Sequence, residues 1–171
     1  MNKQIIQTFF YIFLSCILTV QLQAKTINEK FTAVPHEIID LSNLKGQKLS
    51  CQPKLIILHF WATWCPKCHA EMPQLDKIYE HYEKKGVTVI APTIDIFEKE
   101  KLAKYYQDHG ITHLEKVIDP NLVVAAAAGI KGVPITLFIN SKSEVIGKAI
   151  GPIDWNIAEF DVWYSKLKLG D

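Results

Sequence analysis

Two cysteines separated by two residues, Cys65 and Cys68, are the side chains of this sequence best suited to chemistry. Such a pair can close a small disulfide ring and open it again, and so exchange electrons with other dithiols. The pair follows an apolar run, Leu55–Phe60, and precedes a helical pattern, which places the first thiol at a helix N-terminus. The free N–H groups and the dipole there favour the thiolate, which is the reactive form. The spacing therefore predicts dithiol–disulfide chemistry.

The same motif permits two other kinds of site. With His69 it reads C-x-x-C-H, the attachment motif of a c-type haem, although Met72 is too near in sequence to ligate the opposite face of that haem. With His109 or His113 the cysteines would make half of a copper or zinc site, as in a metal chaperone. Nothing in the sequence forces those histidines near the pair. Both alternatives stay open here, but the prediction contains no cofactor and no metal.

Periodic apolar residues predict the elements that position the pair. The apolar run Leu55–Phe60 is typical of a central strand buried on both faces, and the stripe after Pro66 is typical of a helix that Gly86 closes. The other predicted elements are strands at 37–41, 87–91, 116–118, 135–139 and 145–150 and helices at 98–109, after Asp119 and after Asp154, the two aspartates acting as caps. This order predicts an α/β three-layer sandwich, with a mixed central sheet and helices on both faces.

The first 24 residues form a separate segment. Lys3 precedes an apolar run over 5–20, and the small residue Ala24 stands before a polar stretch. This pattern predicts a signal peptide cleaved after Ala24, with an uncleaved membrane anchor as the alternative. The domain would then comprise 25–171 and lie in the periplasm or another extracytoplasmic space.

Charge and cysteine count limit the possible functions. The chain has 19 basic residues, every one a lysine, against 18 acidic ones, and no basic stripe that would indicate nucleic-acid binding. The absence of arginine weakens any bidentate clamp for phosphate. If Cys65 and Cys68 pair, Cys51 is left over in the exported part. It is interpreted as a free thiol, with a resolving or intermolecular role as the alternative.

Three motifs together resemble one known family. They are FWATWC at 60–65, GVP at 132–134 and GPIDW at 151–155. In this combination they resemble the exported TlpA/ResA-like branch of the thioredoxin-like thiol–disulfide oxidoreductases, over about 50–168 of the chain. The resemblance implies a thioredoxin-like fold with an N-terminal extension and an extra helix–strand insertion between the cysteines and Pro134.

The resemblance also implies roles for the motif residues. Cys65, nearest the helix start, is expected to attack client disulfides and to be the more exposed thiol, while Cys68 is the buried resolving thiol. Lys67 would favour the thiolate through its charge, unless it is only a solvated lysine. Trp64 and Pro66 are expected to contact the client together with Lys67.

Residues outside the motif complete the predicted site. Pro134 resembles the cis-proline of the family, whose preceding residue, here Val133, pairs with an extended client segment; an ordinary turn proline is the alternative. Glu71 is expected to relay protons to and from Cys68, unless it faces solvent. His59 replaces the buried acid or amide of relatives, and is interpreted either as a second proton carrier or as a core histidine.

Function and partners follow from the same resemblance. We expect a monomeric protein-disulfide reductase that acts on client proteins with cysteine pairs, such as apocytochrome c in cytochrome c biogenesis or copper-site assembly factors. A membrane thiol reductase would recharge it, and contact with the membrane would be limited to the N-terminal segment. The direction of electron flow depends on the reduction potential, so an oxidase or isomerase of the same fold is the alternative.

Overall fold

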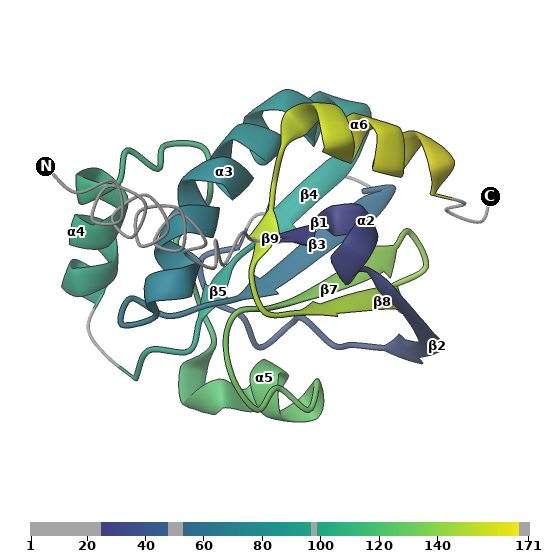
Figure 1. Cartoon of the computed structure of the whole chain (residues 1–171). Coiled ribbons are helices and arrows are strands. Elements are labelled where there is room, and N and C mark those ends of the chain that lie inside the picture. Colours follow the sequence, from purple (N-terminus) through teal and green to yellow (C-terminus); the bar gives the residue numbers. More distant parts are fainter. Residues whose placement is uncertain (1–24, 48–52, 97–98, 168–171) are drawn as a thin grey trace, which may run out of the picture.

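The computed structural model describes residues 25–47, 53–96 and 99–167 (Figure 1). The predicted signal or anchor segment and Cys51 lie outside these ranges. Within them, no helix is both long enough and apolar enough to cross a bilayer. The main sheet has five strands in the order β2 (Thr32–Ile38), β8 (Glu144–Ile150), β7 (Ile135–Asn140), β3 (Leu55–Phe60) and β4 (Val87–Ile90).

Strand β3 is the centre of this sheet. It pairs in parallel with β4 and antiparallel with β7, so the sheet is mixed, as predicted. Leu55 and Ile57 point into an apolar cluster on one face of the sheet, and Leu58 and Phe60 point into a cluster on the other face. Because every residue of β3 is buried, the strand needs the continuous apolar run that its sequence shows.

Helices cover both faces of the sheet (Figure 1). Helices α3 (Pro66–Tyr82) and α6 (Ile157–Lys166) lie over one face, and α4 (Lys99–Asp108) contributes buried residues to the same cluster. The short helix α5 (Val123–Ala127) lies on the opposite face. The predicted three-layer α/β sandwich is therefore confirmed.

The N-terminal extension and the insertion are both present. β1 (Lys25–Thr26) pairs in parallel with β9 (Ile153–Asp154), α2 (Ile27–Lys30) follows, and β2 forms an edge of the main sheet. The strand predicted at 37–41 therefore starts earlier, at Thr32. The insertion consists of α4 and β6 (Val117–Ile118), which pairs with β5 (Pro92–Thr93) in a separate two-stranded sheet.

Two predicted helix starts need correction. Asp154 does not cap α6, because it belongs to β9 and pairs with Thr26 of β1. Asn156 caps the helix instead, and its side chain accepts the N–H groups of Ala158 and Glu159. An asparagine is as good a cap as an aspartate, but only Asp154 was predicted from the sequence, and the pairing of β9 with β1 was not foreseen.

The helix predicted after Asp119 is shorter than expected. A 3-10 turn, η2 (Pro120–Leu122), comes first, and Asn121 and Leu122 adopt left-handed backbone angles. Helix α5 then has only five residues. Leu122, not Asp119, is the N-cap residue of α5, but the N–H groups of its second and third residues, Val124 and Ala125, donate to the Asp119 carboxylate at 3.0 and 2.7 Å.

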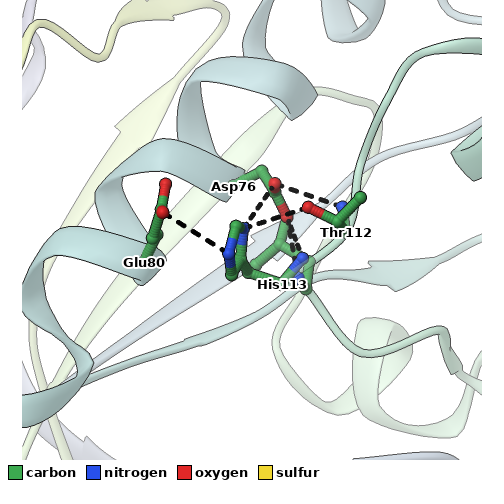
Figure 2. Close-up of polar contacts among 5 residues, drawn as sticks. Asp76, Glu80, Thr112 and His113 are labelled. Atoms are coloured by element: carbon green, nitrogen blue, oxygen red, sulfur yellow. Dashed lines mark hydrogen bonds and ion pairs between the residues drawn. The ribbon is translucent and has the colours of Figure 1, made fainter.

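A carboxylate on α3 fixes the segment that follows α4. Asp76 is buried, and it accepts the backbone N–H groups of Thr112, His113 and Leu114 at 2.8–3.2 Å (Figure 2). The His113 ring also lies between Asp76, at 3.1 Å, and Glu80, at 3.6 Å. Burial raises the pKa of Asp76, but these hydrogen bonds outweigh it and hold the pKa below its usual value.

Removing this carboxylate is expected to destabilise the fold. Asp76→Ala leaves three backbone donors without their acceptor, so the free energy of unfolding should fall by about 3 kcal/mol. In the wild type, the stability that the ionised carboxylate contributes should be lost as the pH falls through its lowered pKa, because the folded state stabilises the ionised form. Urea denaturation at pH 7 measures the first effect. Glu80→Ala, on the exposed side of the His113 ring, is the matched control and should change stability by about 0.5 kcal/mol or less. Equal stability of the two variants would contradict the assignment.

Candidate functional site

The cysteine pair lies at the N-terminus of α3, after the short loop that follows β3. Cys65 and Cys68 form a disulfide, and Cys65 is the N-cap residue of the helix. The N–H of Cys68 donates to the Cys65 sulfur at 3.2 Å, and Pro66 occupies the first helical turn, where its missing N–H costs nothing. Cys65 is 4% exposed and Cys68 fully buried, which is the predicted order. In the reduced state, the same N–H and the helix dipole favour a thiolate at Cys65.

The loop before the cysteines is held by the chain that follows β4. The Trp61 indole donates to the Ala91 carbonyl at 2.9 Å. The N–H of Thr63 and the hydroxyl of Thr93 donate to one oxygen of Asp95, at 2.9 and 2.7 Å. The other Asp95 oxygen is buried and has no hydrogen-bond partner among the described residues.

Sequence reasoning missed Asp95 as a residue that positions the motif. The available signal was its place just beyond strand β4. Parallel neighbours end at the same edge of a sheet, so the chain after β4 must lie beside the chain after β3, which is the motif loop.

The three histidines invoked by the haem and metal alternatives, His69, His109 and His113, contact groups other than the cysteine sulfurs. A ring nitrogen of His69 lies 2.7 Å from the Thr63 carbonyl, so this histidine ties the helix to the motif loop. His113 binds Asp76, and His109 stacks on Tyr105 with the ring centroids 3.9 Å apart. In the described part of the chain, no group of three or more His, Cys, Asp or Glu side chains suits a metal ion. The contacts therefore favour neither the haem alternative nor the copper-chaperone alternative.

Glu71 lies one turn beyond Cys68 and is buried, so the solvent-facing interpretation is wrong. One carboxyl oxygen accepts the N–H of Ile153 at 2.9 Å and the indole N–H of Trp155 at 3.1 Å. The other oxygen is buried without a partner among the described residues. Burial raises the pKa of Glu71 to about 7, although the two hydrogen bonds and the charge of Lys30 act against the rise. A carboxyl of this kind can gain or lose a proton at neutral pH.

His59 lies on β3 and is also fully buried. Its Nδ1 is 2.9 Å from the Thr136 hydroxyl, its Nε2 has no partner among the described residues, and Trp155 packs edge-on against the ring. Burial lowers the pKa of His59 to about 3, so the imidazole is neutral at physiological pH. This environment favours the interpretation of His59 as a core histidine over that of a second proton carrier.

A groove of about 400 Å³ lies beside the motif. It contains three of the residues predicted to contact a client, namely Lys67, Val133 and Pro134, and the Val133–Pro134 peptide bond is cis, as predicted. Its other lining residues are Gly129, Lys131, Gly132, Ile135, Ile150 and Gly151. Trp64 and Pro66 do not line it. They lie exposed on the motif itself, Trp64 with 64% of its surface accessible.

A family model described as Redoxin matches residues 24–163 of the chain. The chain belongs to the Redoxin family. Relatives of this Redoxin-family protein include the thiol-disulfide oxidoreductase ResA of Halalkalibacterium halodurans, 31% identical over 139 residues, which cover 81% of this chain and 74% of the relative. The ResA of Geobacillus thermodenitrificans is 29% identical over 155 residues, covering 85% and 87% of the two chains. The predicted TlpA/ResA-like family and thiol–disulfide oxidoreductase activity are thereby confirmed.

Solved structures agree with the fold of this Redoxin-family protein. StoA from Bacillus subtilis matches with a TM-score of 0.57 and 21% identity, over 75% of this chain and 98% of StoA. A thioredoxin family thiol:disulfide interchange protein from Chlorobium tepidum matches with a TM-score of 0.57 and 26% identity, over 70% and 82% of the two chains. The thioredoxin-like architecture predicted from the sequence is therefore confirmed.

The site of this Redoxin-family protein thus combines three chemical features. The disulfide at the start of α3 supplies the redox centre, and the helix N-terminus favours the attacking thiolate. Glu71 supplies a buried group that titrates near neutral pH. The groove with Val133 and Pro134 supplies a surface next to the motif on which a polypeptide segment can rest.

Proposed function

We propose that this protein is an exported reductant of disulfides in client proteins. The observation that carries the proposal is the placement of a helix-capping disulfide one turn from a buried carboxyl whose pKa is raised to about 7. Such a carboxyl suits a thiol that must lose its proton in one half of the cycle and regain it in the other. The reductive direction rests on the similarity to the ResA proteins.

In the proposed cycle, the Cys65 thiolate attacks one sulfur of a client disulfide and releases the other client sulfur as a thiolate. Cys68 then gives its proton to Glu71 and attacks the Cys65 sulfur in the mixed disulfide. This step forms the Cys65–Cys68 disulfide and releases the second client thiolate. The client gains two electrons and this protein loses two. His59 stays neutral throughout and takes no proton.

The client is proposed to lie in the groove beside the motif. The backbone of Val133 would pair with an extended client segment, and Pro134 would hold that segment against the disulfide. Lys67 adds positive charge near the reacting thiolates, and Trp64 and Pro66 contribute exposed surface. Proposed clients are proteins with cysteine pairs, such as apocytochrome c or copper-site assembly factors.

The N-terminal segment supports the proposed location. An apolar stretch that ends in a small residue fits export to the periplasm or another extracytoplasmic space, with either cleavage after Ala24 or retention as an anchor. Outside the cytoplasm, glutathione and thioredoxin do not keep thiols reduced, so a membrane thiol reductase is proposed to return two electrons to the pair. The protein is proposed to act as a monomer.

Equilibration with glutathione buffers of graded composition tests the proposed direction. A reductase should have a reduction potential clearly more negative than that of the glutathione couple, because it must donate electrons to client disulfides. Cys51→Ser is the matched control and should leave the potential unchanged. A potential equal to or above that of glutathione would overturn the reductase proposal in favour of the oxidase or isomerase alternative.

A further inference from the structure

The groove beside the disulfide carries positive charge from separate parts of the chain. Lys67 comes from the motif at the start of α3, and Lys131 comes from the segment before Pro134; both are exposed. Lys30 does not line the groove, but its ammonium group donates to the backbone carbonyl of Ile150, a lining residue, at 3.0 Å. The described residues that line the groove include no aspartate or glutamate. Its rim is therefore cationic, while the chain as a whole is nearly neutral.

Between these cations the groove is apolar. Val133 and Pro134, just before β7, and Ile135, its first residue, line one side, and Ile150 at the end of β8 lines the other. Ile150 is 63% exposed and falls on an exposed position of the alternation along β8, so its aliphatic side chain faces solvent beside the groove. A client side chain that covers Ile150 would remove this apolar surface from water.

We propose that the groove selects client segments that carry an acidic residue beside the reactive cysteine, together with an apolar residue that packs on Ile150. This inference rests on the proposed function, in which the groove receives the client, and adds the chemical class of segment that it accepts. An aspartate or glutamate would lie near the ammonium groups of Lys67 and Lys131, whereas a lysine there would be repelled. Because these charges are exposed, the preference should weaken when salt screens them.

Two disulfide-bridged peptides of equal length test the selection. They carry the same apolar residue and the same bridged cysteines, and differ only in a glutamate or a lysine beside the reactive cysteine. The reduced full-length protein is expected to reduce the glutamate peptide about tenfold faster than the lysine peptide at low salt. In about 1 M NaCl the ratio should approach one. The ratio of rates is the readout, since a change in thiol reactivity affects both peptides alike.

Charge reversal at the rim completes the test. The double variant Lys67→Glu/Lys131→Glu should invert the ratio in favour of the lysine peptide. Lys142 lies in the turn at the opposite end of the β7–β8 hairpin. Lys142→Glu also makes the net charge more negative, but it should keep the wild-type ratio. Equal rates for the two peptides in the wild type, or an unchanged ratio in the double variant, would overturn the inference alone. Failure to reduce either peptide would overturn the proposed reductase function as well.

Discussion

Replacing Cys65 with serine is expected to lower the rate of client disulfide reduction by about 10³-fold or more, the scale on which enzymes lose activity with their nucleophile. Cys65 is the helix-capping thiol and the one that keeps some exposure, so the mixed disulfide must form on its sulfur. A hydroxyl in its place remains protonated at neutral pH and does not attack sulfur. The measurement is the initial rate of reduction of a bridged peptide by the reduced protein.

The remaining cysteine provides the control for this loss. Cys51→Ser removes a thiol outside the C-x-x-C motif and should keep the wild-type rate. An active Cys65→Ser variant together with an inactive Cys51→Ser variant would show that the nucleophile has been assigned to the wrong cysteine.

Replacing Glu71 with glutamine is expected to slow reduction at pH 7 by about 10²-fold, the lower end of what general acid–base catalysis contributes. Burial raises the pKa of Glu71 to about 7, so in the wild type the rate should rise as this carboxyl loses its proton and becomes able to accept one from Cys68. Glutamine keeps the shape and one acceptor oxygen but cannot take the proton. The rise near pH 7 should therefore vanish from the pH–rate profile of the variant.

The free energy of unfolding of the wild type should fall over the pH range in which its reaction rate rises. A carboxyl with a raised pKa in the folded state binds its proton more tightly there than in the unfolded chain. Ionising Glu71 therefore costs stability as the pH rises from its ordinary value of 4.5 to about 7. Relative to Glu71→Gln, the wild type should lose about 3 kcal/mol of unfolding free energy over that range. Glu80→Gln, at an exposed site on the same helix, should change neither the rate nor the pH dependence. A wild-type pH–rate profile in Glu71→Gln would contradict the proton-transfer role.

Local sequence patterns were sufficient to predict the elements that carry the disulfide. The run Leu55–Phe60 had the composition of a strand buried on both faces, and the apolar stripe after Pro66 had the helical period. The cis peptide bond before Pro134 was predicted from the resemblance of the GVP motif to the family. The strand and helix patterns depend on neighbouring residues, so they can be recognised without knowledge of the packing.

The environment of the titratable residues could not be read in the same way. Glu71 is buried because Ile153 and Trp155, 82 and 84 positions later, bring their N–H groups to its carboxyl. The partner of His59 is Thr136, 77 positions later on a neighbouring strand. Nothing near either residue in the sequence indicates these contacts. Their pKa values therefore followed from the tertiary structure alone.

The cap of α6 was predicted at Asp154 but is Asn156, and this error also came from a contact that is distant in sequence. Both residue types are good caps, and the choice depended on the pairing of β9 with β1 near the other end of the described chain. The groove is likewise lined by Lys67, Lys131 and Ile150 from three separate segments, and local sequence patterns do not predict that these residues lie together.

Mass spectrometry of a trapped intermediate tests the central claim most directly. In the Cys51→Ser/Cys68→Ser variant the resolving thiol is absent, so attack by Cys65 on a bridged client peptide should stop at the mixed disulfide. The account predicts one peptide per protein, linked through Cys65 and released by a reductant. The absence of any adduct at Cys65, in a variant that retains the fold, would contradict the assignment of Cys65 and Cys68 as the attacking and resolving thiols.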